Sequence, residues 1–433
     1  MATNIAAVSL WGTQIGALVW HPDSLHGEFQ YSPALQNSGI EPCPVTMPVR
    51  SEPYEFRSLN RETFKGLPGM LADVLPDKFG NALIDQWLAR QGRDKADFNP
   101  VERLCYIGNR GMGALEFAPL LGDNKLADAP INIQEMVQLA SDILTAKKID
   151  IQLKNEKIDA QALAQILEIG TSAGGARAKA VIAWNKTTKT ICSGHMQPKP
   201  GFSYWLIKFD GVSGNNDKEL NDPKGYGRIE YAYYLCARKA GIAMSECQLL
   251  EEGGRTHFMS QRFDRSAQGR KYHMISLCGM AHYDYQVPGA TSYEQALQVC
   301  QKLKLPMDDK LQLFSRMVFN VIMRNQDDHT KNISFIMDRV GKWRISPAYD
   351  MTYSYNPVGD WTSKHQMSIN GKQDDFSMND LLATAKVAGL NRSKCKKIIS
   401  DVLSISHDWE RIAKNVGIEK QRISAIRQTF RRL

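Results

Sequence analysis

The segment from Asn325 to Asn332, followed by Asp350, constrains the fold and the chemistry of this chain more than any other. Apolar residues recur at helical spacing from Leu313 to Ile322, so we expect a half-buried helix that ends near Asn325 and leaves Asp327 on an anchored loop. A carboxylate, an amide five residues later and a second carboxylate match the parts used in magnesium-dependent phosphoryl transfer. Asp327 would then accept or orient the proton of a substrate hydroxyl. A polar loop capping a helix would explain the first part of the pattern equally well.

The metal ligands of such a site are predicted on both sides of a hairpin. Asn332 would bind magnesium through its amide oxygen, and a hairpin between residues 333 and 346 would return Asp350 as a second ligand. Asp350 could equally be a turn residue or a helix cap. Lys331 could contact the transferring phosphoryl group, whereas His329 is expected to have a structural role in stabilising the loop.

Candidates for the phosphate contacts lie earlier in the chain. Gly174 and Gly175 would let backbone N–H groups in a loop over residues 171–177 approach phosphates, although glycine-rich loops are more often plain turns. Lys208 lies within the otherwise apolar strand expected over 204–209, and it is expected either to reach solvent or to pair with phosphates. Glu230 is its candidate partner, with Glu219 and Glu246 as alternatives. None of these motifs is specific alone.

Length and composition limit the classes of protein to which this chain can belong. The 433 residues are 43% hydrophobic and contain no apolar run long enough for a transmembrane helix, so we expect two or three soluble domains. The start lacks the features of a signal peptide, and eight scattered cysteines without a C-x-x-C pair favour reduced thiols. We therefore expect a cytoplasmic protein with no membrane association.

The net charge of +8 is concentrated near the C-terminus. Residues 392–433 contain eleven Lys or Arg residues and four Asp or Glu residues, an excess of seven positive charges. This segment is expected to be either a phosphate-contacting surface or a solvated helix face.

Apolar patterning predicts a strand-rich half followed by a helix-rich half. We expect strands over 5–12, 15–20, 29–31, 179–184, 204–209 and 257–260, and helices over 79–90, 162–167 and 229–240. Residues 106–117 are expected to be a glycine-rich segment running into a strand, 121–130 a linker, and 210–227 a long polar loop. Beyond residue 292 the chain should be mostly helical. This is the order of a protein-kinase-like domain.

Taken together, five ordered motifs resemble those of the HipA family, the kinase toxins of bacterial HipBA-type toxin–antitoxin modules. The motifs are an N-terminal signature at 64–80 continued at 111–115, a phosphate-loop segment at 172–179, an adenine hinge at 261–265, a catalytic motif at 327–332 and a metal motif at 347–350. One departure is Gln261, which stands where an acidic residue can occur.

The resemblance implies an α+β, protein-kinase-like bilobal fold with ATP and Mg²⁺ as cofactors. It implies an N-terminal α+β subdomain over 1–125, a small β-rich N-lobe over 126–265 and a mainly helical C-lobe over 266–433. The implied site residues are catalytic Asp327, metal ligands Asn332 and Asp350, and nucleotide contacts from Ser172, Ala173, Gly174, Gly175, Lys179, Lys208, Gln261, Arg262, Phe263, His329, Lys331 and Asn332.

The resemblance also implies a biological setting. Ser172 would be an autophosphorylation site that switches the kinase off, because a phosphate there would compete with the phosphates of ATP. The implied partners are a HipB-like DNA-binding antitoxin, operator DNA through that complex, and a protein substrate, by analogy an aminoacyl-tRNA synthetase. Two alternatives stay open: a catalytically weak, antitoxin-bound co-repressor, and a small-molecule kinase of similar fold. The N-terminal signature argues against the second.

Overall fold

The computed structural model describes residues 3–121, 128–145, 160–171, 177–197, 199–212, 216–217, 220–221 and 224–433. The chain divides into two compact units. The first comprises Met1–Gly39, Arg50–Gly227 and Gln248–His273, and the second comprises Ile40–Val49, Arg228–Cys247 and Met274–Leu433. The division into domains at 1–125, 126–265 and 266–433 stays a prediction.

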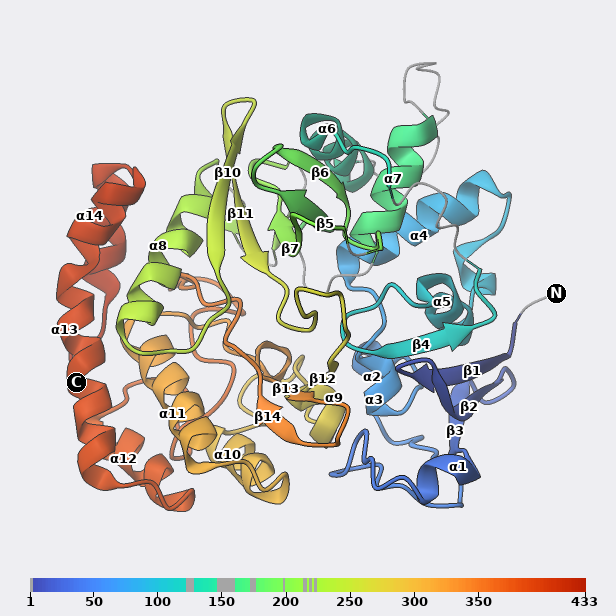
Figure 1. Ribbon diagram of the computed structural model, residues 1–433. Helices are drawn as coiled ribbons and strands as arrows, with labels where there is room; N and C mark the ends of the chain where they lie inside the picture. Colours follow the sequence, from blue (N-terminus) through green and yellow to red (C-terminus); the bar gives the residue numbers. More distant parts are fainter. Residues whose placement is uncertain are drawn as a thin grey trace. The chain divides into compact units, whose positions relative to one another are not determined.

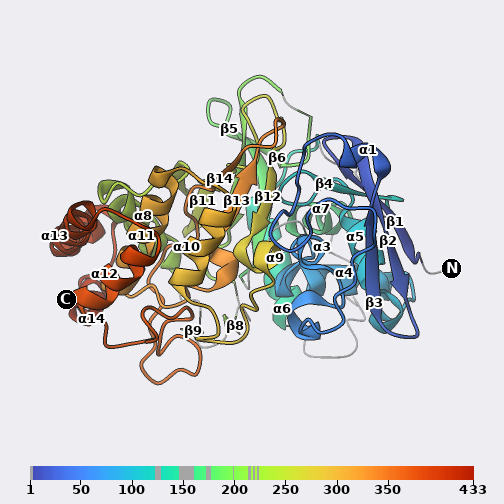
Figure 2. The ribbon, with the colours of Figure 1, turned by 90° about the horizontal axis from the view of Figure 1, so that it is seen from below.

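The first unit begins with an antiparallel sheet of order β3-β2-β1-β4 (Figure 2). Its strands are β1 (Ile5–Leu10), β2 (Thr13–His21), β3 (His26–Tyr31) and β4 (Leu115–Ala118). Trp11 and Gly12 join β1 to β2, and both have positive φ angles, as a type I′ hairpin turn requires. The predicted pair of strands around a glycine turn is therefore confirmed.

Helices of the first unit follow clear local signals. Helix α4 (Lys78–Arg90) begins at Asp77, whose carboxylate accepts a hydrogen bond from the Gly80 amide, and it confirms the helix predicted over 79–90. Helix α5 (Pro100–Ile107) begins with a capping box between Asn99 and Glu102. The shorter helices are α1 (Pro33–Gln36), α2 (Arg61–Phe64), α3 (Gly69–Ala72) and the 3₁₀ turn η1 (Lys95–Asp97).

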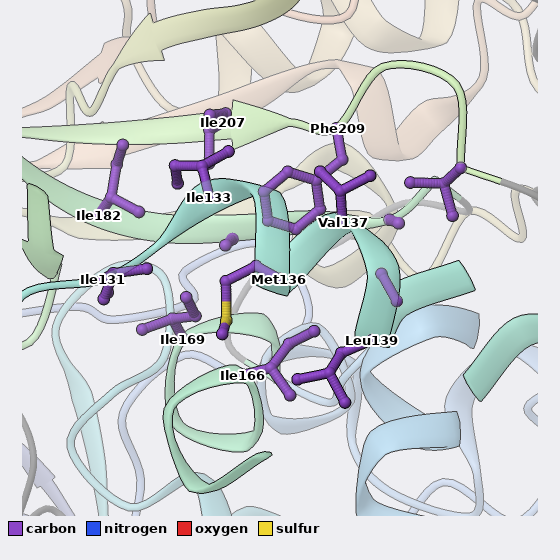
Figure 3. Packing of buried hydrophobic residues seen from close by; sticks show 14 of the residues in the cluster. Ile131, Ile133, Met136, Val137, Leu139, Ile166, Ile169, Ile182, Ile207 and Phe209 are labelled. Carbon is purple, nitrogen blue, oxygen red and sulfur yellow. The ribbon is translucent and has the colours of Figure 1, made fainter. Parts of the chain in front are cut away.

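A second antiparallel sheet of the same unit has the order β10-β11-β7-β5-β6. Its strands are β5 (Lys179–Asn185), β6 (Thr190–Ser193), β7 (Phe202–Lys208), β10 (Cys247–Glu252) and β11 (Arg255–Gln261). Helices α6 (Ile133–Thr145) and α7 (Ala160–Gly170) bury their apolar faces with this sheet (Figure 3). Met136 lies at the centre of that core with Ile166, Ile169 and Phe209, so burial of these side chains holds the sheet and helices together.

The second unit is mainly helical (Figure 1). Its helices are α8 (Tyr226–Lys239, from Arg228), α9 (Leu277–Ala281), α10 (Tyr293–Lys302), α11 (Met307–Ile322), α12 (Met378–Val387), α13 (Arg392–Val416) and α14 (Lys420–Thr429), with the 3₁₀ turn η2 (Thr330–Asn332). Helix α11 packs on α13, which packs on α14. A small sheet of order β12-β13-β14 combines β12 (His273–Ser276), β13 (Ser334–Met337) and β14 (Trp343–Ile345). Strands β13 and β14 confirm the predicted hairpin.

Three segments differ from the predicted elements. Tyr106 and Ile107 end helix α5 and are not part of the glycine-rich segment, because the capping box at Asn99 starts a helix that Gly108 ends. Helix α6 was not predicted. The predicted polar loop over 210–227 contains the short strands β8 (Asn216–Asp217) and β9 (Leu220–Asn221), and its end is the first turn of α8.

All eight cysteines are buried with free thiols, which agrees with the expected reduced state. Among the residues that the structure describes, no helix combines the length and apolar character that crossing a bilayer would need.

Candidate active site

Helix α11 supports the loop that carries Asp327. Its buried face includes Leu313, Phe314 and Val321, and it ends at Ile322 rather than at the predicted Asn325. The Asn325 amide still donates a hydrogen bond to the Asn320 carbonyl at 3.0 Å, so the chain leaves the helix along a fixed path. Asp327 therefore lies on a loop anchored by a buried helix, as predicted.

The carboxylate of Asp327 is partly exposed and held by a tryptophan. Its side chain is 28% exposed, and the indole Nε1–H of Trp361 donates to Oδ1 at 2.6 Å. The Nε2 atom of His329 lies 3.8 Å from the same oxygen, too far for a hydrogen bond. Asp327 thus combines solvent access with a fixed orientation, as a residue that receives a proton from an incoming hydroxyl requires.

Asn332 is joined directly to Asp327. Its amide Nδ2 donates to the main-chain carbonyl of Asp327 at 2.7 Å, and its own N–H donates to the carbonyl of His329. Because the nitrogen end of the amide is bound to the loop, the oxygen end is the group that Asn332 offers to a ligand.

Asn332 and Asp350 line the same pocket. Other lining residues include Tyr293, Arg316, Asn325, Asp328, His329 and Tyr349. Asp350 has a φ of 52°, and Tyr349 before it donates its hydroxyl to the Lys331 carbonyl at 2.6 Å. This hydrogen bond ties the end of the hairpin to the loop that carries Asp327, so the structure brings the two predicted metal ligands to one pocket.

The donor set of this pocket fits magnesium but not a metal held by protein alone. Within the described residues no group of three or more His, Cys, Asp and Glu side chains gathers to bind a metal. Mg²⁺ prefers oxygen ligands and usually takes one or two protein carboxylates together with phosphates and water. The Asn332 amide oxygen and the Asp350 carboxylate are the kind of incomplete set that a metal–nucleotide complex would fill.

Asp328, next to Asp327, has a different environment. It is almost completely buried, and its carboxylate accepts hydrogen bonds from the Tyr293 hydroxyl, from Nδ1 of His365 and from the Gln366 amide, each at 2.8 Å. Burial, together with the Asp328 charge, raises the pKa of Tyr293 well above its usual value, so the hydroxyl keeps the proton that it donates. Sequence reasoning assigned no role to Asp328, Tyr293 or Trp361.

His329 and Lys331 both contact one aromatic ring. The His329 ring lies 5.4 Å from the ring of Tyr285, and the Lys331 ammonium lies 5.1 Å from the same ring centre. Such packing holds the backbone on either side of Thr330, whose hydroxyl donates to the Tyr283 carbonyl.

In the first unit, two candidate lysines face each other across adjacent strands. Lys179 opens β5 and is directly opposite Lys208, which closes β7. Lys179 is buried, and its ammonium lies 3.7 Å from the Asp77 carboxylate, whereas Lys208 lies 5.7 Å from the Phe258 ring. The Asp77 carboxylate offsets part of the repulsion between the two ammonium groups.

The predicted hinge residues Gln261, Arg262 and Phe263 continue from the end of β11. The Arg262 amide donates to the Tyr204 carbonyl at 2.9 Å, and the Arg262 side chain is buried against Asp264. Burial alone would raise the pKa of Asp264, but Arg262, Arg265 and the Gly113 amide together hold it well below its usual range. The Arg262 side chain is therefore occupied inside the protein.

The predicted nucleotide residues Ser172, Ala173, Gly174 and Gly175 lie outside the described residues. Arg177, which follows them, stacks its guanidinium 3.6 Å from the ring centre of Tyr226.

Comparisons with known proteins agree with this architecture. The HipA N-terminal domain model matches residues 6–118, and the HipA-like C-terminal domain model matches residues 171–409. A Haemophilus influenzae protein named "Putative kinase" is 21% identical over 258 residues, which span 52% of this chain and 75% of that protein. A Sinorhizobium fredii protein named "Putative kinase Y4mE" is 23% identical over 349 residues, 75% of this chain and 72% of that protein.

A solved structure gives the fold. A chain from the Shewanella oneidensis complex of toxin–antitoxin proteins HipA and HipB with operator DNA matches 98% of this chain and 95% of its own length. The TM-score is 0.67 at 18% identity. The fold is thus α+β and protein-kinase-like, with a β-rich N-lobe, an extra N-terminal subdomain and a mainly helical C-lobe, as predicted. Since the C-terminal domain model alone spans more than half of the residues, the chain belongs to the HipA family.

Proposed function

We propose that this chain is an ATP-dependent serine/threonine protein kinase that transfers the γ-phosphate of ATP to a protein hydroxyl. The observation that carries the proposal is the bond between the Asn332 amide and the Asp327 carbonyl, with Asn332 and Asp350 lining one pocket. A hydroxyl-orienting carboxylate and an adjacent pair of oxygen ligands are the parts that phosphoryl transfer requires.

The protein residues have separate tasks in this reaction. Asp327 receives or orients the proton of the attacking hydroxyl, and Asn332 and Asp350 would hold Mg²⁺ through their side-chain oxygens. Mg²⁺, when bound with ATP, neutralises charge on the phosphates. Lys331 stands one residue from Asn332 and offers a positive charge to the transferring group.

The remaining proposed contacts hold the nucleotide. Lys179 and Lys208 supply positive charge to the phosphates, and the segment of Ser172, Ala173, Gly174 and Gly175 supplies backbone N–H groups. The hinge of Gln261, Arg262 and Phe263 contacts adenine through main-chain groups. Because the Arg262 amide is already used by Tyr204, the other main-chain groups of the hinge must carry that contact.

Radioactive phosphate transfer tests the proposed activity. Purified wild type should transfer ³²P from γ-labelled ATP to itself or to a protein in a cell lysate, and Asp327→Asn should reduce transfer by about 10²- to 10⁴-fold. Asp401→Asn is a matched control, because Asp401 is a solvent-exposed carboxylate of α13 that pairs with Lys397 one helical turn away. Equal transfer by wild type and Asp327→Asn would refute the proposal.

Ser172 is proposed as the regulatory phosphosite. Mass spectrometry after incubation with ATP and Mg²⁺ should find phosphate on Ser172 in wild type and none in Asp327→Asn. Ser172→Ala should then keep its activity after preincubation with ATP, whereas wild type loses activity. Loss at the same rate in both proteins would rule out Ser172 as the off-switch.

The biological proposal is a growth-inhibiting toxin that works with a HipB-like antitoxin. The family assignment and the Shewanella oneidensis complex with HipB and operator DNA support it. The substrate is proposed, by analogy, to be an aminoacyl-tRNA synthetase in the cytoplasm. Phosphoproteomics after short induction would identify the substrate, and expression of Asp327→Ala should leave growth unaffected.

A second role, co-repression, is favoured by the basic segment 392–433. Helices α13 and α14 carry most of its charge on exposed side chains. This chain should strengthen the binding of its antitoxin to operator DNA in a gel shift, and by itself bind DNA only weakly and in a salt-sensitive manner. Unchanged operator affinity on adding the chain would exclude co-repression without touching the kinase proposal.

A further inference from the structure

We propose that Trp361 is a positioning residue for Asp327. The segment 361–366 holds the Trp361 indole against the Asp327 carboxylate. The inference rests on the proposed kinase function and adds a residue to its machinery. Its basis is the 2.6 Å hydrogen bond from the indole Nε1–H to Oδ1 of Asp327. Trp361 lies 34 residues beyond Asp327, so this contact is made by folding and not by the local chain.

An indole group suits this task chemically. It has one N–H donor and no acceptor, so it can fix a carboxylate oxygen without taking the proton that the carboxylate must receive. Hydrogen bonds to a charged partner are short and about twice as strong as neutral ones. The rigid ring also fixes the direction of the bond, which a lysine or serine in its place would not do.

The two neighbouring carboxylates hold the two ends of this segment. Asp327 binds Trp361, while the adjacent Asp328 binds His365 through Nδ1 and Gln366 through its amide, both at 2.8 Å. The Gln366 side chain in turn donates to the Trp361 carbonyl. The segment is thereby closed into a small loop whose base is the buried Asp328.

A third connection comes from the residue before Asp327. The Gln326 side chain is buried and donates through Nε2 to the Thr362 carbonyl at 3.2 Å. Three consecutive residues of the catalytic loop, 326 to 328, therefore bind the segment 361–366 at separate points. This redundancy fixes the indole independently of its bond to Asp327, as pre-organised positioning requires.

Nuclear magnetic resonance tests the contact without relying on activity. The chain has eight tryptophans, so ¹⁵N-tryptophan labelling should give eight indole signals, and Trp361→Phe identifies the one from Trp361. Asp327→Asn should move that signal, because the charged acceptor is lost, and Asp401→Asn should leave it in place. A Trp361 signal that ignores Asp327→Asn would overturn the proposal.

Kinetics test the consequence for catalysis. Trp361→Phe keeps the ring and removes the N–H, so the rate of phosphoryl transfer should fall about 10- to 100-fold while the KM for ATP stays the same. The split between rate and KM separates this role from a merely structural one, because a general disruption of the pocket would also raise the KM for ATP.

A matched variant is Trp343→Phe, whose indole donates to the Glu41 carbonyl and which should leave the rate of phosphoryl transfer unchanged. A Trp361→Phe enzyme with the wild-type rate contradicts the inference, and a faster one shows that Trp361 blocks Asp327 instead. If wild type transfers no phosphate but the Trp361 indole signal responds to Asp327→Asn, the kinase proposal fails, whereas the hydrogen bond between Trp361 and Asp327 is confirmed.

Discussion

The carboxylate of Asp328 and the imidazole Nδ1 of His365 lie 2.8 Å apart, and each side chain is at most 1% exposed. Asp328 directly follows Asp327, the residue proposed to accept the substrate proton. A buried carboxylate is stable only when its hydrogen bonds are satisfied, and Asp328 has three donors, from Tyr293, His365 and Gln366. The pair is therefore a structural support for the loop that carries Asp327.

Asp328→Asn should destabilise the protein strongly. Oδ2 of Asp328 accepts from Tyr293 and His365, and Oδ1 accepts from the Gln366 amide. In either orientation the NH2 group of an asparagine would face at least one of these donors. Breaking a buried charged network typically costs about 3–5 kcal/mol. Urea unfolding at pH 7 measures the loss. Asp401→Asn, at an exposed ion pair, should cost less than about 1 kcal/mol, and a similar small effect for Asp328→Asn would contradict this account.

His257 should make the stability of the protein depend on pH. The Asp210 amide donates to Nδ1 of His257 at 2.9 Å, so the imidazole must be neutral there. Burial lowers the pKa of His257 from 6.5 to about 4, helped by Arg255 and opposed by Asp210. The unfolded chain therefore binds a proton at His257 more readily than the folded protein does. The contribution of neutral His257 to the free energy of unfolding is complete above pH 6.5 and is lost as the pH falls toward 4.

His257→Asn tests this dependence, since an Asn Oδ1 can replace Nδ1 as acceptor and does not titrate. Between pH 7 and pH 5 the wild type should lose about 2 kcal/mol more stability in urea unfolding than the variant. His407→Asn, at an exposed position, should follow the wild type. Parallel curves for wild type and His257→Asn would show that His257 is not the group responsible.

The parts of the fold that sequence could predict are those set by local periodicity and turn chemistry. The apolar spacing from Leu313 to Ile322 predicts α11, and the strand–turn–strand pattern after Asn332 predicts the β13–β14 hairpin. Together these two elements carry Asn332 and Asp350 to one pocket. The start of helix α5 also has a recognisable sequence signal, which consists of Asn99, Glu102 and the proline between them. The prediction instead followed the glycines after Ile107 and assigned Tyr106 and Ile107 to a glycine-rich segment.

The hydrogen bonds of the candidate site, in contrast, could not be predicted from local sequence patterns. Trp361 and His365 lie in a segment without helix or strand, and no periodic pattern indicates which side chain will turn toward Asp327 and which toward Asp328. Their roles depend on burial and on long-range hydrogen bonds, which only the folded chain specifies. The same is true of Arg262, predicted as a hinge residue, whose side chain is taken up by Asp264.

Asn332→Ala should separate catalysis from stability. It removes the amide oxygen proposed for Mg²⁺ and the 2.7 Å bond to the Asp327 carbonyl. We expect phosphoryl transfer to fall by at least about 10²-fold, with a loss of only about 1 kcal/mol in unfolding free energy. Asn370→Ala removes a comparable bond, to Asp380, and should keep full activity. Preserved activity in Asn332→Ala would exclude Asn332 as a metal ligand.

Removal of the Asp264 charge should strongly destabilise the first unit. Its carboxylate is fully buried and accepts from the Arg262 and Arg265 guanidinium groups and from the Gly113 amide, each at 2.7 Å. Asp264→Asn keeps the shape but removes the ion-pair partner of the buried Arg262 and Arg265 guanidinium groups, for which a loss of about 3–5 kcal/mol is expected. Because the pKa of Asp264 lies well below its unfolded value, the carboxylate's contribution to the free energy of unfolding is complete at neutral pH. That contribution is lost only as the pH falls below the usual Asp range.

The difference between wild type and Asp264→Asn in urea unfolding should therefore be constant from pH 8 to pH 6. A difference that already disappears in that range would mean that Asp264 is not held charged by the two arginines.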